Sequence, residues 1–150
     1  MTTDLILAIA HHLLAFGLFG LFFALFVLIR PGLSGAPLHR VAIVDRFQGA
    51  CAGLLVVVGV LRLIYGLKGP DFYLSGWPFW AKMAAFAAVG ILSLPPTLRI
   101  IAWHRAAKAD PAWLVPDAEI GRVRSLLGLQ FLVFLLVPVF AAMMARGVGL

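Results

Sequence analysis

The sequence predicts an all-α integral membrane protein, a four-helix bundle that forms a single domain over residues 1–150. Its 150 residues are 63% hydrophobic and only 12% charged, with a mean hydropathy of +1.07, which excludes an ordinary soluble domain. A helix needs about 20 apolar residues to cross a bilayer. Four stretches reach this length, at about 5–29, 47–65, 79–101 and 126–144.

The stretch at 5–29 is expected to remain in the mature protein. It lacks a preceding basic segment and a small-residue cleavage site before Arg30, so it does not resemble a removable signal peptide. The link that follows, RPGLSGAPLHR, contains Pro and Gly residues that break the helix. Because this link is short, the first two spans should be antiparallel neighbours. Asp45 stands just before the second span, where a carboxylate favours a helix N-terminus.

The link between the second and third spans, GLKGPDFYLSGWP, is typical of an interfacial turn with a belt of aromatic residues. Pro95 and Pro96 predict a kink or an end near the far side of the third span. Before the fourth span, Pro116 and Asp117 are suited to open a short amphipathic helix. Cys51 is the only cysteine and lies within a span, which excludes disulfides and thiolate metal clusters.

The basic residues predict the orientation of the chain in the membrane. Loops one and three contain most of them: Arg30, Arg40, Arg46, Arg99, Arg105, Lys108, Arg122 and Arg124. Loop two contains only Lys68. By the positive-inside rule, loops one and three face the cytoplasm. Both termini then lie outside, which is the periplasm if the source is a Gram-negative bacterium. We expect a multi-pass protein of the bacterial inner (cell) membrane.

The net charge of +6 does not predict nucleic-acid binding, because the basic residues form no aromatic-interleaved patch. Chain direction instead places four polar side chains in the outer half of the bundle: His11, His12, Arg62 and Lys82. A cation inside an apolar span is energetically unfavourable and usually marks function. We expect these side chains to hold an anionic or metal-bearing ligand. The alternative is that Arg62 and Lys82 extend to lipid headgroups.

Histidine is the predicted metal ligand, and two histidines are candidates. His11 and His12 point about 100° apart on a helix, so both cannot be axial ligands of one iron. His39 and His104 belong to the opposite side, and we expect no two histidines at matching depth on different spans. A haem would therefore have one histidine ligand per chain. Its second ligand would be Lys82, Met83, Met143, Met144, a histidine of a second copy, or none.

The stretch 45–105 resembles the core of a bacterial family of predicted four-helix inner-membrane proteins of unknown function. The motifs G-x-x-R, K-G-x-x-x-Y, F-x-x-K and P-T-x-R carry this resemblance, which extends over nearly the whole chain. The matching positions are Asp45, Gly49, Gly59, Arg62, Lys68, Gly69, Tyr73, Phe79, Lys82, Pro96, Thr97, Arg99 and Trp103.

More distantly, HLLAFGLFGLFFALFVLIR and SGWPFWAKMAAF are similar to segments of HemJ-type protoporphyrinogen oxidases and of CopD-like membrane domains. HemJ proteins bind haem b through a histidine of the first span and need a lysine in a later span. The resemblance places these roles on His12, whose His-Leu-Leu-Ala is similar to the family's His-Leu-Ile-Gly, and on Lys82.

The leading functional prediction is a membrane haem-b-binding protein with a redox role, either electron transfer or HemJ-like oxidation of a porphyrin-type substrate. His12 or His11 would ligate the iron, and Lys82 would be the catalytic residue. Lys82 and Arg62 would neutralise carboxylates, and Tyr73 would add a hydrogen bond or stack at the entrance.

Two alternatives remain open. One is a CopD-like copper-handling protein that binds Cu(I) through imidazole and thioether groups. The other is a non-catalytic accessory subunit or lipid-binding bundle, whose basic residues meet anionic lipid. Expected partners are membrane lipids, a redox partner protein or a porphyrin, and a second copy of the chain.

Overall fold

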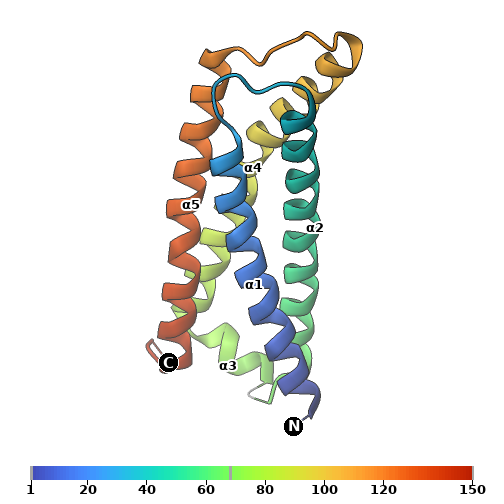
Figure 1. The fold of residues 1–150 in the computed structure, drawn as a ribbon. Helices are drawn as coiled ribbons and strands as arrows, with labels where there is room; N and C mark the ends of the chain where they lie inside the picture. Colours follow the sequence, from blue (N-terminus) through green and yellow to red (C-terminus); the bar gives the residue numbers. More distant parts are fainter. Residues whose placement is uncertain (1, 68, 150) are drawn as a thin grey trace.

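The computed structural model of the protein describes residues 2–67 and 69–149. The helices are α1 (Thr2–Leu28), α2 (Gly35–Tyr65), α3 (Gly69–Ser75), α4 (Trp77–Ala109) and α5 (Asp117–Ala145) (Figure 1). All except the short α3 are long and apolar enough to cross a membrane. Large apolar side chains point outward, including Phe16, Ile91 and Leu132, as a lipid-facing surface requires. The predicted helical class and the four candidate spans are thus confirmed.

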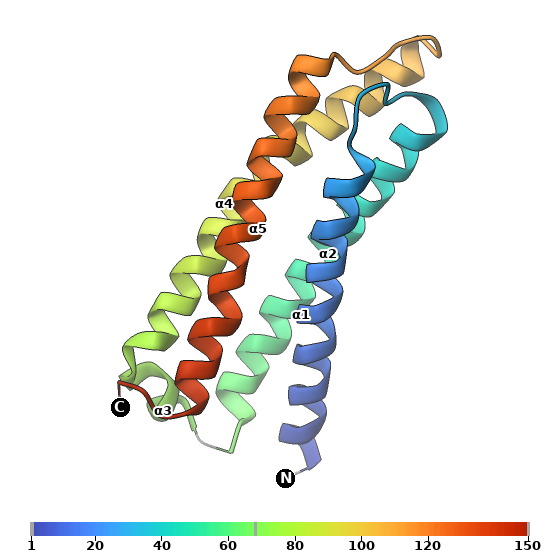
Figure 2. The ribbon, with the colours of Figure 1, turned by 60° about the vertical axis from the view of Figure 1, so that its left-hand side comes forward.

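The four long helices form two hairpins. Helix α1 packs mainly on α2, and α4 mainly on α5, whereas the two hairpins contact each other less extensively (Figure 2). The loops at 29–34 and 110–116 lie at one end of the bundle, called the loop end. The start of α1, helix α3 and the last turn of α5 lie at the other, called the terminal end (Figure 1). In the first loop, Gly32 and Gly35 have φ angles of 80° and 48°, which favour glycine.

Two apolar clusters hold the bundle together. The loop-end core includes Leu25, Ile29, Leu38, Val41, Ala42, Ile100, Trp103, Ile120, Val123 and Leu127. The middle core consists of Leu18, Phe22, Leu55, Val89 and Phe134. Beyond the middle core, towards the terminal end, the described parts of α1, α2 and α5 contain no buried residue. On α4, by contrast, Pro78, Phe79 and Ala85 are buried at this end.

Arg124 joins the hairpins at the loop end. Its Nη1 donates hydrogen bonds to the carbonyl oxygens of Phe26 and Ile29, at 2.8 and 2.5 Å. These carbonyls belong to the C-terminus of α1, where backbone acceptors lack helical partners. The guanidinium also lies over the Phe26 ring, 4.4 Å from its centroid. One side chain of α5 thus caps α1.

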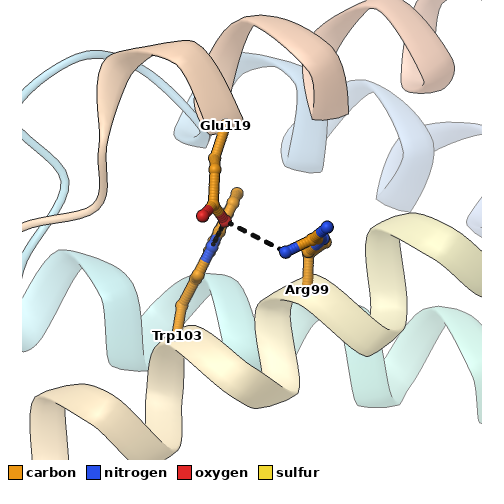
Figure 3. Close-up of polar contacts among 3 residues, drawn as sticks. All are labelled: Arg99, Trp103 and Glu119. Atoms are coloured by element: carbon orange, nitrogen blue, oxygen red, sulfur yellow. Dashed lines mark hydrogen bonds and ion pairs between the residues drawn. The ribbon is translucent and has the colours of Figure 1, made fainter.

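Glu119 ties α5 to α4 at the same end (Figure 3). Its Oε2 accepts a 2.7 Å hydrogen bond from Nε1 of the buried Trp103. Nη1 of Arg99 lies 3.7 Å from the same oxygen, but the Arg99 side chain is 58% exposed, so this ion pair contributes little. The backbone N–H of Val115 donates to the carbonyl of Leu33 and links the two loops.

Several predicted helix limits need correction. Helix α2 begins at Gly35, α4 continues to Ala109, and α5 begins at Asp117, so each extends beyond its apolar stretch at the loop end. The extension of α4, AWHRAAKA, is rich in good helix formers. Pro95 and Pro96 lie inside α4 and do not end it. Asp117 opens the fourth long helix rather than a separate short one.

The predicted cap role of Asp45 is wrong. Because α2 starts at Gly35, Asp45 lies well inside the helix, where it is 6% exposed. The predicted turn between the second and third spans also contains a seven-residue helix, α3. Cys51 packs against the middle core and donates a 3.3 Å hydrogen bond to the carbonyl of Leu14.

Candidate functional site

His11, Arg62 and Lys82 come together near the terminal end, and we call them the basic cluster. They belong to α1, α2 and α4, so both hairpins contribute. The His11 ring lies against α2, where a Cβ on Gly59 would be 3.5 Å from its Cε1. His11 interacts electrostatically with both cations, and Lys82 with Arg62. Like charges close together are unfavourable unless an anion separates them.

Two nitrogen atoms of the cluster are buried without a partner. Within the described chain, Nδ1 of His11 and Nε of Arg62 accept or donate no hydrogen bond. A buried polar atom without a partner is destabilising by about 1–3 kcal/mol. Lys82 Nζ lies 5.4 Å from the centroid of the Phe79 ring, a contact that stabilises a cation without neutralising it. The cluster therefore has unused hydrogen-bonding capacity and uncompensated positive charge.

His12 faces a different direction from His11. The two rings are nearly perpendicular, at 85°, with centroids 6.3 Å apart. His12 is exposed on the outer face of α1, and its Nδ1 is 2.6 Å from the carbonyl oxygen of Ala8. A carbonyl can only accept, so Nδ1 carries a proton and donates this hydrogen bond. The structure thus brings His11, but not His12, to the two cations.

Tyr73 lies on α3, outside the cluster. Its described ring contact is an edge contact with Phe72, at 5.5 Å between centroids. Trp77 and Trp80 are more than half exposed at the same end of the bundle, the position expected of residues that anchor a helix at the membrane interface.

The methionines considered as ligands lie on two helices, α4 and α5. Met83 is partly exposed on α4, and Met143 and Met144 are half-buried near the end of α5. In residues 2–67 and 69–149, no group of three or more His, Cys, Asp or Glu side chains is arranged to hold a metal ion.

His39 and His104 lie together at the loop end. Their rings are stacked at 28°, with centroids 5.3 Å apart. The expectation that no two histidines on different helices share a depth is therefore wrong. It failed because α2 and α4 both extend beyond their apolar stretches.

Sequence reasoning missed a second group of polar residues. Asp45 and Gln48 of α2, Thr97 of α4 and Gln130 of α5 lie inside the bundle, and we call them the polar layer. Their signal in the sequence is two isolated amide side chains, Gln48 and Gln130, within stretches of apolar residues. Such residues in a span usually face the interior.

The model of a protein family described as "Predicted membrane protein (DUF2214)" matches residues 3–149. This match agrees with the sequence-based resemblance to a four-helix membrane family of unknown function. It does not relate the chain to HemJ-type oxidases or CopD-like domains. No curated protein and no solved structure matches the chain significantly.

Proposed function

The chain belongs to this family of predicted membrane proteins, and we propose that it binds haem b at the basic cluster and has a redox role. The observation that supports this most directly is the convergence of His11, Arg62 and Lys82 from three helices, with two buried nitrogen atoms unpartnered. A ligand that fits them must present negative charge and an acceptor for imidazole or guanidinium donors.

Haem b matches the chemistry of these three side chains. Its two propionate groups are carboxylates, for which Arg62 and Lys82 are suitable partners in a low-dielectric site. Its iron accepts imidazole as an axial ligand, and His11 is the histidine beside the cations. When bound, haem b supplies one-electron redox chemistry. Lys82 then positions a carboxylate, either of the haem or of a porphyrin-type substrate.

The packing of the bundle favours a large flat ligand at this place. The cluster spans the two hairpins, which contact each other less than the helices within each hairpin. No described residue of α1 before Leu18 is buried, and none of α2 after Leu55. A ring that enters from the lipid between the hairpins would meet no buried side chain on these parts of α1 and α2, and would pack against Phe79 and Ala85 of α4.

The choice of His11 departs from the assignment that the HemJ resemblance suggests, which is His12. His12 is exposed on the outer face of α1, and its Nδ1 is hydrogen-bonded to the carbonyl of Ala8 in the same helix. A haem held by His12 would lie on the lipid-facing surface. It would also lack Arg62 and Lys82 as partners for its propionates.

The test is an absorbance spectrum of protein purified from haem-replete cells. We expect a Soret band that shifts on reduction. His11→Ala should abolish it, because the iron loses its protein ligand, whereas the matched control His12→Ala should retain it. The reverse result would move the haem to the outer face of α1. Stoichiometric copper without iron would replace haem by copper as the cofactor.

An anionic lipid headgroup is a second candidate ligand for the same cations. The exposed Trp77 and Trp80 on α4 place Lys82 near the expected membrane interface. This candidate predicts purified protein without iron, copper or visible absorbance, and phospholipid retained by the wild type but lost from Lys82→Met.

We also propose that the terminal end faces outward, the periplasm of a bacterial cell, and that the loop end faces the cytoplasm. The support is the concentration of basic residues at the loop end, in the loop at 29–34 and mostly in the adjoining helix segments: Arg30, Arg40, Arg46, Arg99, Arg105, Lys108, Arg122 and Arg124. Reporters inserted at Gly69 and at Asp110 should lie on opposite sides of the membrane. A periplasmic signal at Asp110 would invert this orientation.

A further inference from the structure

The polar layer lies between the two apolar cores. On α2, α4 and α5 alike, its residues are flanked by the loop-end core on one side and by the middle core on the other. Asp45, Gln48 and Gln130 are 6%, 5% and 0% exposed. At 1.5 Å per residue, Asp45 and Gln130 are about 15 and 20 Å from the helix ends at the loop end. The layer therefore lies well inside the bundle, between the two apolar cores.

One hydrogen bond crosses the layer between the hairpins. Oγ1 of Thr97 donates to Oδ1 of Asp45 at 2.8 Å. Asp45 and Gln48 are three residues apart on α2, so their side chains lie on the same face of the helix. Nε2 of Gln130 donates to the carbonyl of Val89 at 3.3 Å. Because this bond uses the amide nitrogen, the amide oxygen of Gln130 can still accept a hydrogen bond inside the bundle.

Oxygen acceptors in the layer outnumber the donors that satisfy them. In the described chain, Oε1 of Gln48 and Oε1 of Gln130 are buried without a hydrogen-bond partner. A proton on Asp45 would add only one donor. A bound cation would contact several oxygens at once and would also neutralise the carboxylate, which is strongly unfavourable in an apolar environment when unpaired.

The proline pair in α4 leaves two backbone carbonyls of this helix without their usual donors. Pro95 and Pro96 have no backbone N–H, so the carbonyls of Ile91 and Leu92 lose their usual helical donors. These residues lie about one turn before Thr97. In membrane proteins, interruptions of helical hydrogen bonding often provide carbonyl oxygens to sodium ions.

We infer that the polar layer binds a monovalent cation of the sodium class. Asp45 provides the charged ligand, and the hydroxyl of Thr97 and the buried amide oxygen of Gln48, one turn along α2, provide neutral ligands. Oxygen ligands suit hard cations, and a single carboxylate balances a single positive charge. This site is separate from the basic cluster and does not depend on haem binding.

The experiment measures the thermal unfolding midpoint of the full chain in detergent, as choline is replaced by sodium at constant ionic strength. We expect a saturable rise of roughly 3–6 °C at ten times the half-saturating concentration. Asp45→Asn should remove this rise, because the variant loses the charged ligand. The matched control Asp71→Asn, on the exposed surface of α3, should keep the rise of the wild type.

Three results would overturn the inference. The first is a wild-type unfolding midpoint that changes with neither sodium nor potassium. A midpoint that changes with pH alone counts as this result, because it would indicate a proton or a water molecule in the layer. The second is an unchanged sodium response in Asp45→Asn. If that variant does not fold, Thr97→Val replaces it. We then expect a half-saturating sodium concentration about tenfold higher, and an unchanged value is the third contrary result.

Discussion

Substituting Met for Arg124 should lower the free energy of unfolding by about 3 kcal/mol, because two charge-assisted hydrogen bonds are lost together. Both bonds end on carbonyls at the C-terminus of α1, those of Phe26 and Ile29. Methionine keeps much of the apolar length of the side chain but has no donor. Thermal unfolding in detergent, followed by circular dichroism, should show a midpoint roughly 5–10 °C lower.

Arg122→Met is the matched control, since Arg122 lies on the exposed surface of the same helix. It should leave the midpoint nearly unchanged. Arg124→Lys should recover only part of the loss, because an ammonium cannot reproduce the planar arrangement of guanidinium donors. An Arg124→Met protein as stable as Arg122→Met would show that the contacts of Arg124 do not hold α1 to α5.

Lys82→Met should weaken retention of the bound ligand by about 10- to 100-fold, as expected when one charge-assisted contact of roughly 1.5–3 kcal/mol is lost in a poorly solvated site. Lys82 is the member of the basic cluster that comes from the second hairpin. Its loss leaves Arg62 as the single cation for two carboxylates. The ratio of haem to protein after extensive washing, read from the Soret band, measures the effect.

Lys82→Arg separates two possible roles of the lysine. A guanidinium can pair with a carboxylate but stays protonated and does not ligate iron. Recovery of haem content in Lys82→Arg therefore indicates charge pairing, and failure to recover it indicates ligation. Lys108→Met, at the exposed loop end of α4, is the matched control. If Lys82→Met keeps haem content and spectrum unchanged, Lys82 anchors α4 to lipid headgroups.

Hydropathy was sufficient to predict the four long helices, because only an internally hydrogen-bonded helix satisfies the backbone of an apolar stretch in lipid. It could not predict where they end. The segment after the third apolar stretch is polar yet helical, and it is held at Trp103 by a hydrogen bond to Glu119. Such contacts depend on the partner helix, which local sequence does not reveal.

The same limit applies to the candidate site. Counting residues from the membrane surface was sufficient to predict that His11, Arg62 and Lys82 lie at the same depth. The structure does bring these three side chains together. Which of two adjacent histidines faces inward depends on the rotation of α1 against α2. That rotation depends on packing, including the contact of His11 with Gly59. Asp45 was misinterpreted for a related reason, since the length of α2 was underestimated.

The hydrogen bond between Thr97 and Asp45 bears on how the chain assembles in the bilayer. Each hairpin can insert as a unit, but lipid provides little hydrophobic drive for two inserted hairpins to associate. A slip of one helical turn, about 5.4 Å, would separate Thr97 from Asp45 and press the carboxylate against an apolar core. Apolar side chains alone would tolerate several alignments. The buried carboxylate of Asp45 therefore favours one alignment of the two hairpins. In that alignment, Lys82 lies at the depth of His11.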